Sequence, residues 1–249
     1  MVKSPSAWKG KKKNLKKNPV KRYNCRKVKR RKNRNLEELS MDKGKRKLTD
    51  KELKRKDCFE KFTSEMQQKG YKMKNIIINT QQAKYLCLLI MLPFMAFAFW
   101  IYDNVNGFDL DCLSWGFVIA LPVLILCLSV LHELIHGIFW SLFAKNHFHS
   151  IDFGIIWSSF SPYCTCSNPL KKWQYLLGVA MPAFVLGGGV AAVAVMANQL
   201  LLFFLAEYMI LSGGGDFLII LKSMLYHTDK QESVYCDHPY ECGFVVFEK

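Results

Sequence analysis

The segment His132-Glu133-Leu134-Ile135-His136 carries two imidazoles four positions apart, with a carboxylate between them. In a helix, positions i and i+4 share one face, so both histidines can bind the same metal ion. Glu133 lies about 100° around the helix from His132, beside that ion but free of it. A glutamate in this place can act as a general base for metal-activated water and then protonate a leaving amine. The spacing predicts a metal-dependent hydrolase site at His132, Glu133 and His136.

The surroundings of this segment are almost purely apolar from Trp115 to Leu142. A charged residue at the centre of a bilayer costs roughly 2.5–3.5 kcal/mol on insertion scales, so ionisable groups in such segments are usually functional. In a soluble protein the same pattern also occurs on solvated helix faces without any function. The apolar neighbours exclude that explanation here and favour metal ligation.

Four segments have about the 20 apolar positions that a hydrocarbon core of roughly 30 Å requires. They are apolar on all sides rather than striped, which disfavours four core helices of a soluble protein. Tryptophans lie near the segment ends, where amphipathic rings prefer to sit. We therefore expect an all-α polytopic membrane protein with about four transmembrane helices, over residues 85–102, 115–142, 173–197 and 200–221.

Charge divides the chain into two parts. Residues 1–57 contain 24 lysines and arginines and six acidic residues, whereas residues 58–249 contain 11 and 14. Such a basic segment cannot bury a core, so we expect a disordered tail over residues 1–47. The loop 103–114 has three aspartates and no basic residue, while basic residues precede the first span and follow the second and fourth. The positive-inside rule then places both termini in the cytoplasm.

The regions outside the spans show weaker signals. Residues 48–70 read as an amphipathic helix, residues 74–80 as a short strand, and residues 150–160 as an extended edge near the membrane surface. The basic tail is expected to bind anionic lipid headgroups, with nucleic acid as the alternative ligand for the tail. The expected organisation is a basic cytoplasmic tail, a cytoplasmic amphipathic segment, a four-helix transmembrane domain with the metal site and a cytoplasmic C-terminal tail, over residues 1–47, 48–84, 85–222 and 223–249.

A third metal ligand is needed, because catalytic zinc usually has three protein ligands and a water molecule. Asp216 is our choice, as an acid inside the apolar part of the fourth span. His132 is 17 residues from Trp115 and Asp216 is 16 residues from Leu200. At a rise of about 1.5 Å per residue, both lie about 25 Å from the outer surface. The sequence leaves other ligands open, namely Asp152, Glu207, His227, Asp237 and His238.

Helix-breaking residues lie close to these candidates. Gly213-Gly214-Gly215 directly precede Asp216, and glycines in a helix cost stability. We expect them to allow close helix approach or local unwinding beside the metal. Pro182 is expected to kink the third span and leave a carbonyl free near the site.

These features together resemble the putative zincin peptidase family of small bacterial integral membrane proteins, which is itself similar to the site-2 intramembrane metalloproteases. The resemblance covers about residues 50–249 and implies that His132, His136 and Asp216 bind zinc, that Glu133 is the general base, and that the protein lies in a bacterial cytoplasmic membrane. It rests on HELIHG at 132–137, FG and PYC between 153 and 164, GGD at 214–216 and DHPYECGF at 237–244.

The sequence therefore predicts a zinc-dependent membrane endopeptidase that cuts a membrane-embedded or membrane-proximal peptide near the cytoplasmic face. The alternative is a non-enzymatic membrane protein on a protease-like scaffold that binds or sequesters peptides in an immunity or regulatory role. The two differ in whether the metal keeps an open, water-filled position. Oxygen ligation by Asp216 also permits divalent ions other than zinc.

Overall fold

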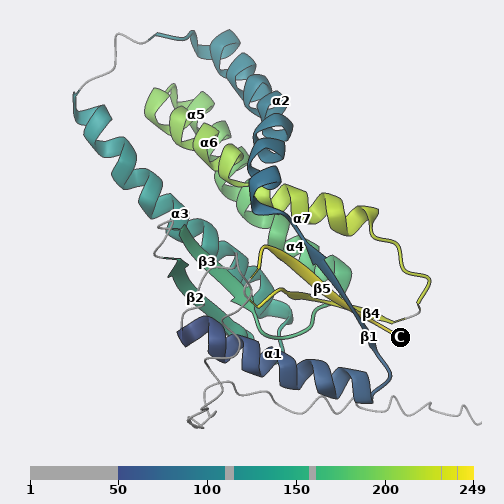
Figure 1. Ribbon diagram of the computed structural model, residues 1–249. Coiled ribbons are helices and arrows are strands. Elements are labelled where there is room, and N and C mark those ends of the chain that lie inside the picture. Colours follow the sequence, from purple (N-terminus) through teal and green to yellow (C-terminus); the bar gives the residue numbers. More distant parts are fainter. Residues whose placement is uncertain (1–49, 110–114, 157–160, 231, 240) are drawn as a thin grey trace, which may run out of the picture. The chain divides into compact units, whose positions relative to one another are not determined.

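The computed structural model describes residues 50–109, 115–156, 161–230, 232–239 and 241–249. The basic tail expected over residues 1–47 lies outside them. The described part opens with helix α1 (Asp50–Gln68) and strand β1 (Lys72–Ile77), close to the helix and strand expected there (Figure 1). Phe62 and Met66 bury the apolar face of α1 against the strands that follow later in the chain.

Four helical segments are long and apolar enough to cross a membrane, as the sequence predicted. Many of their large apolar side chains point outward: Leu89 is 67% exposed and Ile119 is 70% exposed. Exposed apolar surface on this scale marks a surface that another apolar phase covers, and a bilayer is such a phase. The four predicted spans are confirmed as helices of sufficient length and apolarity at Gln82–Asn106, Trp115–Phe143, Lys172–Ala197 and Leu200–Leu225. The expected all-α class holds as a mostly helical structure to which two small sheets are added.

The first two spans are single helices, α2 (Thr80–Asn106) and α3 (Trp115–Phe143). The third is divided into α4 (Lys172–Pro182), a π-helical turn η4 (Ala183–Gly189) and α5 (Val190–Ala197). The π-helical turn begins directly after Pro182, whose ring has no N–H to donate and clashes with the preceding turn. The proline thus changes the helix geometry, as expected.

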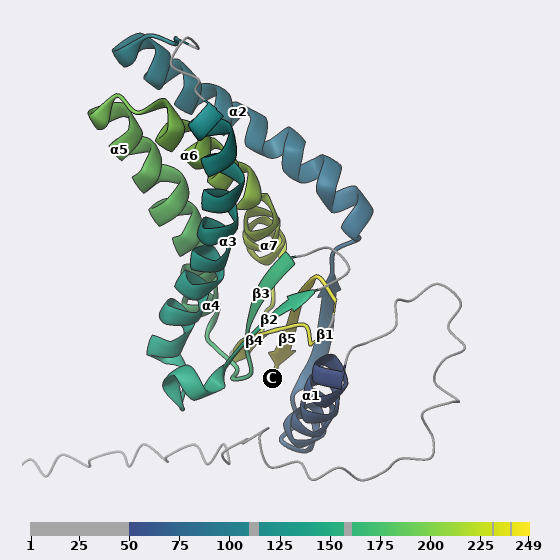
Figure 2. The same cartoon turned by 90° about the vertical axis from the view of Figure 1, so that its left-hand side faces the viewer.

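The fourth span is broken at Gly213 into α6 (Leu200–Ser212) and α7 (Gly214–Leu225), and α7 runs in a different direction from α6 (Figures 1 and 2). At Gly214 a Cβ atom would lie 2.8 Å from Cys87 Cβ, so α7 packs closely on α2 only because this residue is glycine. The glycine run therefore combines a helix break with close helix approach, and Asp216 falls in the first turn of α7.

Two small antiparallel sheets complete the described part. A 3₁₀ turn η3 (His147–Ser150) leads into a hairpin of β2 (Ile151–Ile156) and β3 (Ser161–Cys166), and β3 packs beside α3 (Figure 2). The second sheet has the order β1-β5-β4, from β1, β4 (Ser233–Asp237) and β5 (Gly243–Glu248). Residues 223–249, expected as a tail, thus supply a buried central strand, whose residues are all buried.

The largest aromatic cluster joins this sheet to the helices. Trp140 of α3 and Tyr175 of α4 pack with Tyr235 of β4 and Phe244 of β5. Tyr175 is 1% exposed, and Tyr235 and Phe244 are fully buried. Close packing of α3 on α4 depends on Gly178, where a Cβ would overlap Cδ1 and Nε1 of Trp140.

Gly178→Ala is expected to destabilise the fold by about 1–3 kcal/mol, because the added methyl must displace the Trp140 ring from a close-packed interface. Thermal unfolding of the detergent-solubilised protein measures the change. Gly188→Ala is the matched control, since a Cβ at that position meets nothing within 4 Å. Equal melting temperatures for the two variants would contradict this account of the α3–α4 contact.

Candidate metal centre

Two imidazoles meet inside the helical bundle. His132 and His136 lie one turn apart on α3 and are 7% and 5% exposed. Their Nε2 atoms are 3.2 Å apart, and the two rings are steeply inclined at 77°. The i, i+4 spacing therefore produces the shared face that the sequence predicted.

Asp216 completes the group from α7. Its Oδ2 lies 3.0 Å from Nε2 of His132 and its Oδ1 lies 3.4 Å from Nε2 of His136. The helix break at Gly213 directs the first turn of α7 toward α3, so a carboxylate 80 residues after His136 reaches the histidine pair. Among the described residues, His132, His136 and Asp216 form a group whose ligand atoms all lie within 4.8 Å of one another.

The donor set fits a divalent cation such as zinc. In a tetrahedral zinc site with metal–ligand distances of about 2.0–2.2 Å, neighbouring ligand atoms are about 3.3 Å apart. The two Nε2 atoms are 3.2 Å apart, and each lies 3.0 or 3.4 Å from one of the two oxygens of Asp216, which are separations close to that value. Two imidazole nitrogens and a carboxylate this close together in a buried place need a shared cation or shared protons to offset their mutual repulsion.

The orientation of His136 is fixed from outside the group. Its Nδ1 donates to the carbonyl oxygen of Gly178 at 2.8 Å. A carbonyl can only accept, so the proton is on Nδ1 and the lone pair of Nε2 points at the group, which is the usual arrangement behind a metal-bound histidine. Nδ1 of His132, in contrast, is buried and has no hydrogen-bond partner in the part of the chain that the structure describes.

Glu133 lies beside the group without belonging to it. The residue is partly buried on α3, its charge interacts with His132, His136 and Asp216, and its carboxylate makes a hydrogen bond to the backbone of Cys164 in β3. A general base for hydrolysis has to lie next to the metal ligands without being one of them, and the carboxylate of Glu133 has this position.

The β2–β3 hairpin packs closely on α3 next to the metal group. Gly137 follows His136, and a Cβ at Gly137 would overlap the Phe153 ring and lie 3.1 Å from Ile151 Cγ2. β2 therefore packs its side chains against the glycine. The sequence predicted an extended edge in residues 150–160, and the structure places the hairpin partner β3, rather than β2, nearest to α3.

The outer edge of β3 faces away from β2. The backbone N–H of Cys166 donates to Oδ2 of Asp237 at 2.9 Å, so it does not pair with β2. In an antiparallel pair, every second residue directs its backbone groups to the same edge. Cys164 and Pro162 therefore share this edge, and Cys164 is the residue whose backbone meets Glu133.

The other third-ligand candidates lie apart from the group. Asp152 is exposed on β2, and His227 is exposed after α7. Asp237 accepts hydrogen bonds from Tyr175 and Cys166, and Nδ1 of His238 accepts one from the backbone N–H of Glu241. Glu207 lies on α6, and its Oε1 is buried with no hydrogen-bond partner among the described residues.

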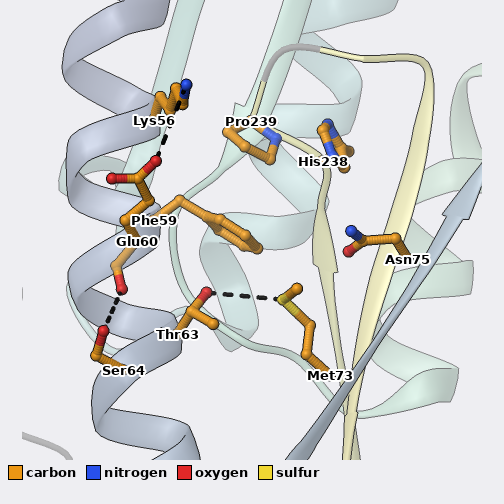
Figure 3. Close-up of a pocket in the computed structure, with 9 residues that line it drawn as sticks. All are labelled: Lys56, Phe59, Glu60, Thr63, Ser64, Met73, Asn75, His238 and Pro239. Carbon is orange, nitrogen blue, oxygen red and sulfur yellow. Dashed lines mark hydrogen bonds and ion pairs between the residues drawn. The ribbon is translucent and has the colours of Figure 1, made fainter. Parts of the chain in front are cut away.

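A cavity of about 310 Å³ lies away from the metal group, between α1, β1 and the turn after β4 (Figure 3). Phe59 and Thr63 line it from α1, Met73 and Asn75 from β1, and His238 from the turn. Thr63 contacts the sulfur of Met73 across it (Figure 3). Because none of its lining residues belongs to the metal group, this cavity is a separate feature.

Comparison with known proteins bears on the same residues. Residues 125–230 match the model of a family described as putative zincin peptidase. The family resemblance read from the sequence is confirmed over this segment, which contains His132, Glu133, His136 and Asp216 and ends before Asp237. No curated protein and no solved structure matches the chain.

Two contributors to the site were not identified from the sequence, namely the ring of Tyr175 and the carboxylate of Asp237. Tyr175 looks like one more aromatic residue in an apolar span. The carbonyl that Pro182 is expected to leave free is, in contrast, that of Gly178, four residues before the proline, and it accepts the hydrogen bond from His136. Asp237 begins the segment DHPYECGF, on which the family resemblance partly rests, but the sequence of that segment indicates no role for the carboxylate.

Metal content tests the donor set. Purified without chelators and reloaded with zinc, the wild-type protein is expected to hold about one zinc per chain, and His132→Ala and Asp216→Ala are expected to lose it, because two remaining ligands do not hold zinc tightly. Elemental analysis by mass spectrometry gives the stoichiometry. His227→Ala, which changes an exposed histidine outside the group, is the control. Zinc retained at full stoichiometry by both ligand variants would exclude this site.

Proposed function

We propose that this chain is a zinc-dependent endopeptidase embedded in a membrane. The observation that carries the proposal is the convergence of His132, His136 and Asp216 within 4.8 Å, with Glu133 beside them, in a bundle of helices that can span a bilayer. The family match over residues 125–230 supports the same reaction class.

The residues divide the chemistry between them. His132, His136 and Asp216 would hold zinc, which when bound supplies Lewis-acid polarisation of a scissile carbonyl and acidifies a water molecule. Glu133 takes up the proton that the attacking water loses and delivers it to the departing amine. Gly178 keeps His136 in the tautomer that presents its Nε2 lone pair.

The substrate peptide would lie along the outer edge of β3. The backbone N–H groups of Cys164 and Cys166 on this edge already bond Glu133 and Asp237, so an extended peptide would pair by donating its own N–H groups to carbonyl oxygens of β3, and such pairing depends little on sequence. Cys164 brings that edge to Glu133, so a peptide paired with β3 would pass beside the three donor atoms. The substrate class is therefore an unfolded or locally unwound peptide segment, embedded in the membrane or next to it.

The placement in the cell follows from charge. Basic residues flank the spans on one side, which supports cytoplasmic termini and cleavage near the cytoplasmic face of a bacterial cytoplasmic membrane. The basic N-terminal residues would contact anionic headgroups, at about 1 kcal/mol for each lysine or arginine close to the surface.

Glu133→Gln is expected to keep its zinc and to lower peptide-bond hydrolysis by about 10²–10⁴-fold, because the amide cannot accept the proton. The measurement is the appearance of new protein N-termini, detected by mass spectrometry, when the purified enzyme is mixed with detergent-extracted bacterial membrane proteins. Asp229→Asn, an exposed acid after α7, is the control.

Two outcomes would count against the proposal. Undiminished cleavage by the Glu133→Gln protein would remove the glutamate from the mechanism. A wild-type protein that holds zinc but produces no new N-termini would instead favour the non-enzymatic scaffold that binds or sequesters peptides.

A further inference from the structure

Asp237, at the end of β4, joins two elements that flank the metal group. Its Oδ1 accepts a hydrogen bond from the hydroxyl of Tyr175 at 2.8 Å, and its Oδ2 accepts one from the backbone N–H of Cys166 at 2.9 Å. Tyr175 lies in α4 and Cys166 ends β3. One carboxylate, from a segment outside the family match, therefore holds a helix and a strand edge at once.

The α4 connection leads to His136. The indole Nε1–H of Trp140 donates to the carbonyl oxygen of Tyr175 at 3.1 Å. The Trp140 ring is stacked on the Tyr175 ring at 5.8 Å and on the His136 ring at 5.2 Å. Gly178, nearly one turn after Tyr175, accepts the hydrogen bond from Nδ1 of His136. Both the stacking and the hydrogen bond that orient His136 thus depend on the position of α4.

The β3 connection leads to Glu133. Cys166 and Cys164 direct their backbone groups to the same edge of the hairpin, and Cys164 meets Glu133. The bond from Asp237 to the N–H of Cys166 anchors the end of that edge. One connection therefore ends at the metal ligand His136, and the other ends at Glu133, the proposed general base.

Burying the Asp237 carboxylate carries a desolvation penalty. Burial raises the pKa of Asp237 to about 6, even though the hydrogen bonds from Cys166 and Tyr175 and the charges of His136 and Arg55 lower it. An apolar residue would avoid the desolvation penalty if packing were the only requirement. What a carboxylate adds is two acceptor oxygens in fixed directions, one for each neighbour.

We propose that Asp237 is a positioning residue. It holds the metal ligand His136 and the outer edge of β3 at fixed positions relative to each other. The proposal rests on the proposed function, because the relative position of His136 and β3 matters for catalysis only if His136 binds zinc and β3 binds the peptide. Asp237 touches neither the metal group nor the substrate itself, and acts through Tyr175 and Cys166.

The test uses the full-length protein in detergent and two readouts that need no substrate. The first is the affinity for Zn²⁺ by competition with a chelator, corrected by the His132→Ala protein for zinc held elsewhere. The second is hydrogen–deuterium exchange of the peptide that contains the Cys166 amide. Tyr226→Phe is the matched control, because it removes a bond of the same 2.8 Å length, from Tyr226 to Glu248, that involves neither Asp237 nor a residue of the metal group.

Tyr175→Phe is expected to weaken zinc binding about tenfold, in the range found when partners behind a metal ligand are removed, and to leave Cys166 exchange unchanged. Asp237→Ala is expected to do the same to zinc and also to speed Cys166 exchange at least tenfold. Should Asp237→Ala fail to fold, Asp237→Asn replaces it, since the amide keeps one acceptor and the shape but loses the other acceptor.

Zinc affinities of the Tyr175 and Asp237 variants within twofold of Tyr226→Phe would overturn the connection to His136. Unchanged exchange at Cys166 in the Asp237 variants would overturn the connection to β3. If the wild-type protein itself binds no zinc, the proposed function and the His136 connection fail together, while the exchange measurement still decides the β3 connection separately.

Discussion

The mutual contact of two imidazoles and a carboxylate in an apolar bundle is the constraint on which the rest of this structure depends. Two imidazole nitrogens and the two oxygens of one carboxylate, with contacts of 3.0 to 3.4 Å, are stable together only when a cation or protons lie between them. Every neighbouring element serves to keep them there. α3 supplies the histidines, α7 turns at Gly213 to bring Asp216, and α4 presents a carbonyl to His136.

Small residues make this convergence possible. The hairpin packs against Gly137, Trp140 packs against Gly178, and α2 packs against Gly214. A Cβ atom at any of these glycines would block or shift the contact. In a membrane, where lipid is as apolar as leucine, close backbone approach replaces the hydrophobic effect as the source of helix association. The glycines are therefore as much a part of the site as the ligands, since they decide how near the ligands can come.

The sequence alone predicted the spans and the three donor residues, because both depend on local signals. A run of 20 apolar residues and an i, i+4 histidine pair need no partner to be recognised, and Asp216 stood out as a charge in an apolar segment. The straight fourth helix assumed for its depth was wrong in detail, since the chain breaks at Gly213, yet Asp216 still reaches His132. Glycine runs indicate a break but do not give the new helix direction.

What the sequence missed was non-local. The sequence predicts a tail where β4 and β5 form, because five- and six-residue strands are recognisable only by their partners, and β5 pairs with β1. The same applies to Asp237, whose neighbours Tyr175 and Cys166 lie 62 and 71 residues away in the chain. Hydrogen bonds from one carboxylate to a side chain and to a backbone amide produce no periodic pattern in the sequence, so they cannot be predicted from it.

The order of the strands also has a consequence for biosynthesis. β5 pairs with β1 on one side and β4 on the other, so the sheet that carries Asp237 cannot close until residues 243–248 have been made, about 170 residues after β1. At 5–20 residues per second that interval is on the order of ten seconds or more. The four spans are synthesised during this interval, and the last one ends at Leu225, before β5 has been made. The sheet that supports the candidate metal centre is therefore completed last, after all four spans have been synthesised.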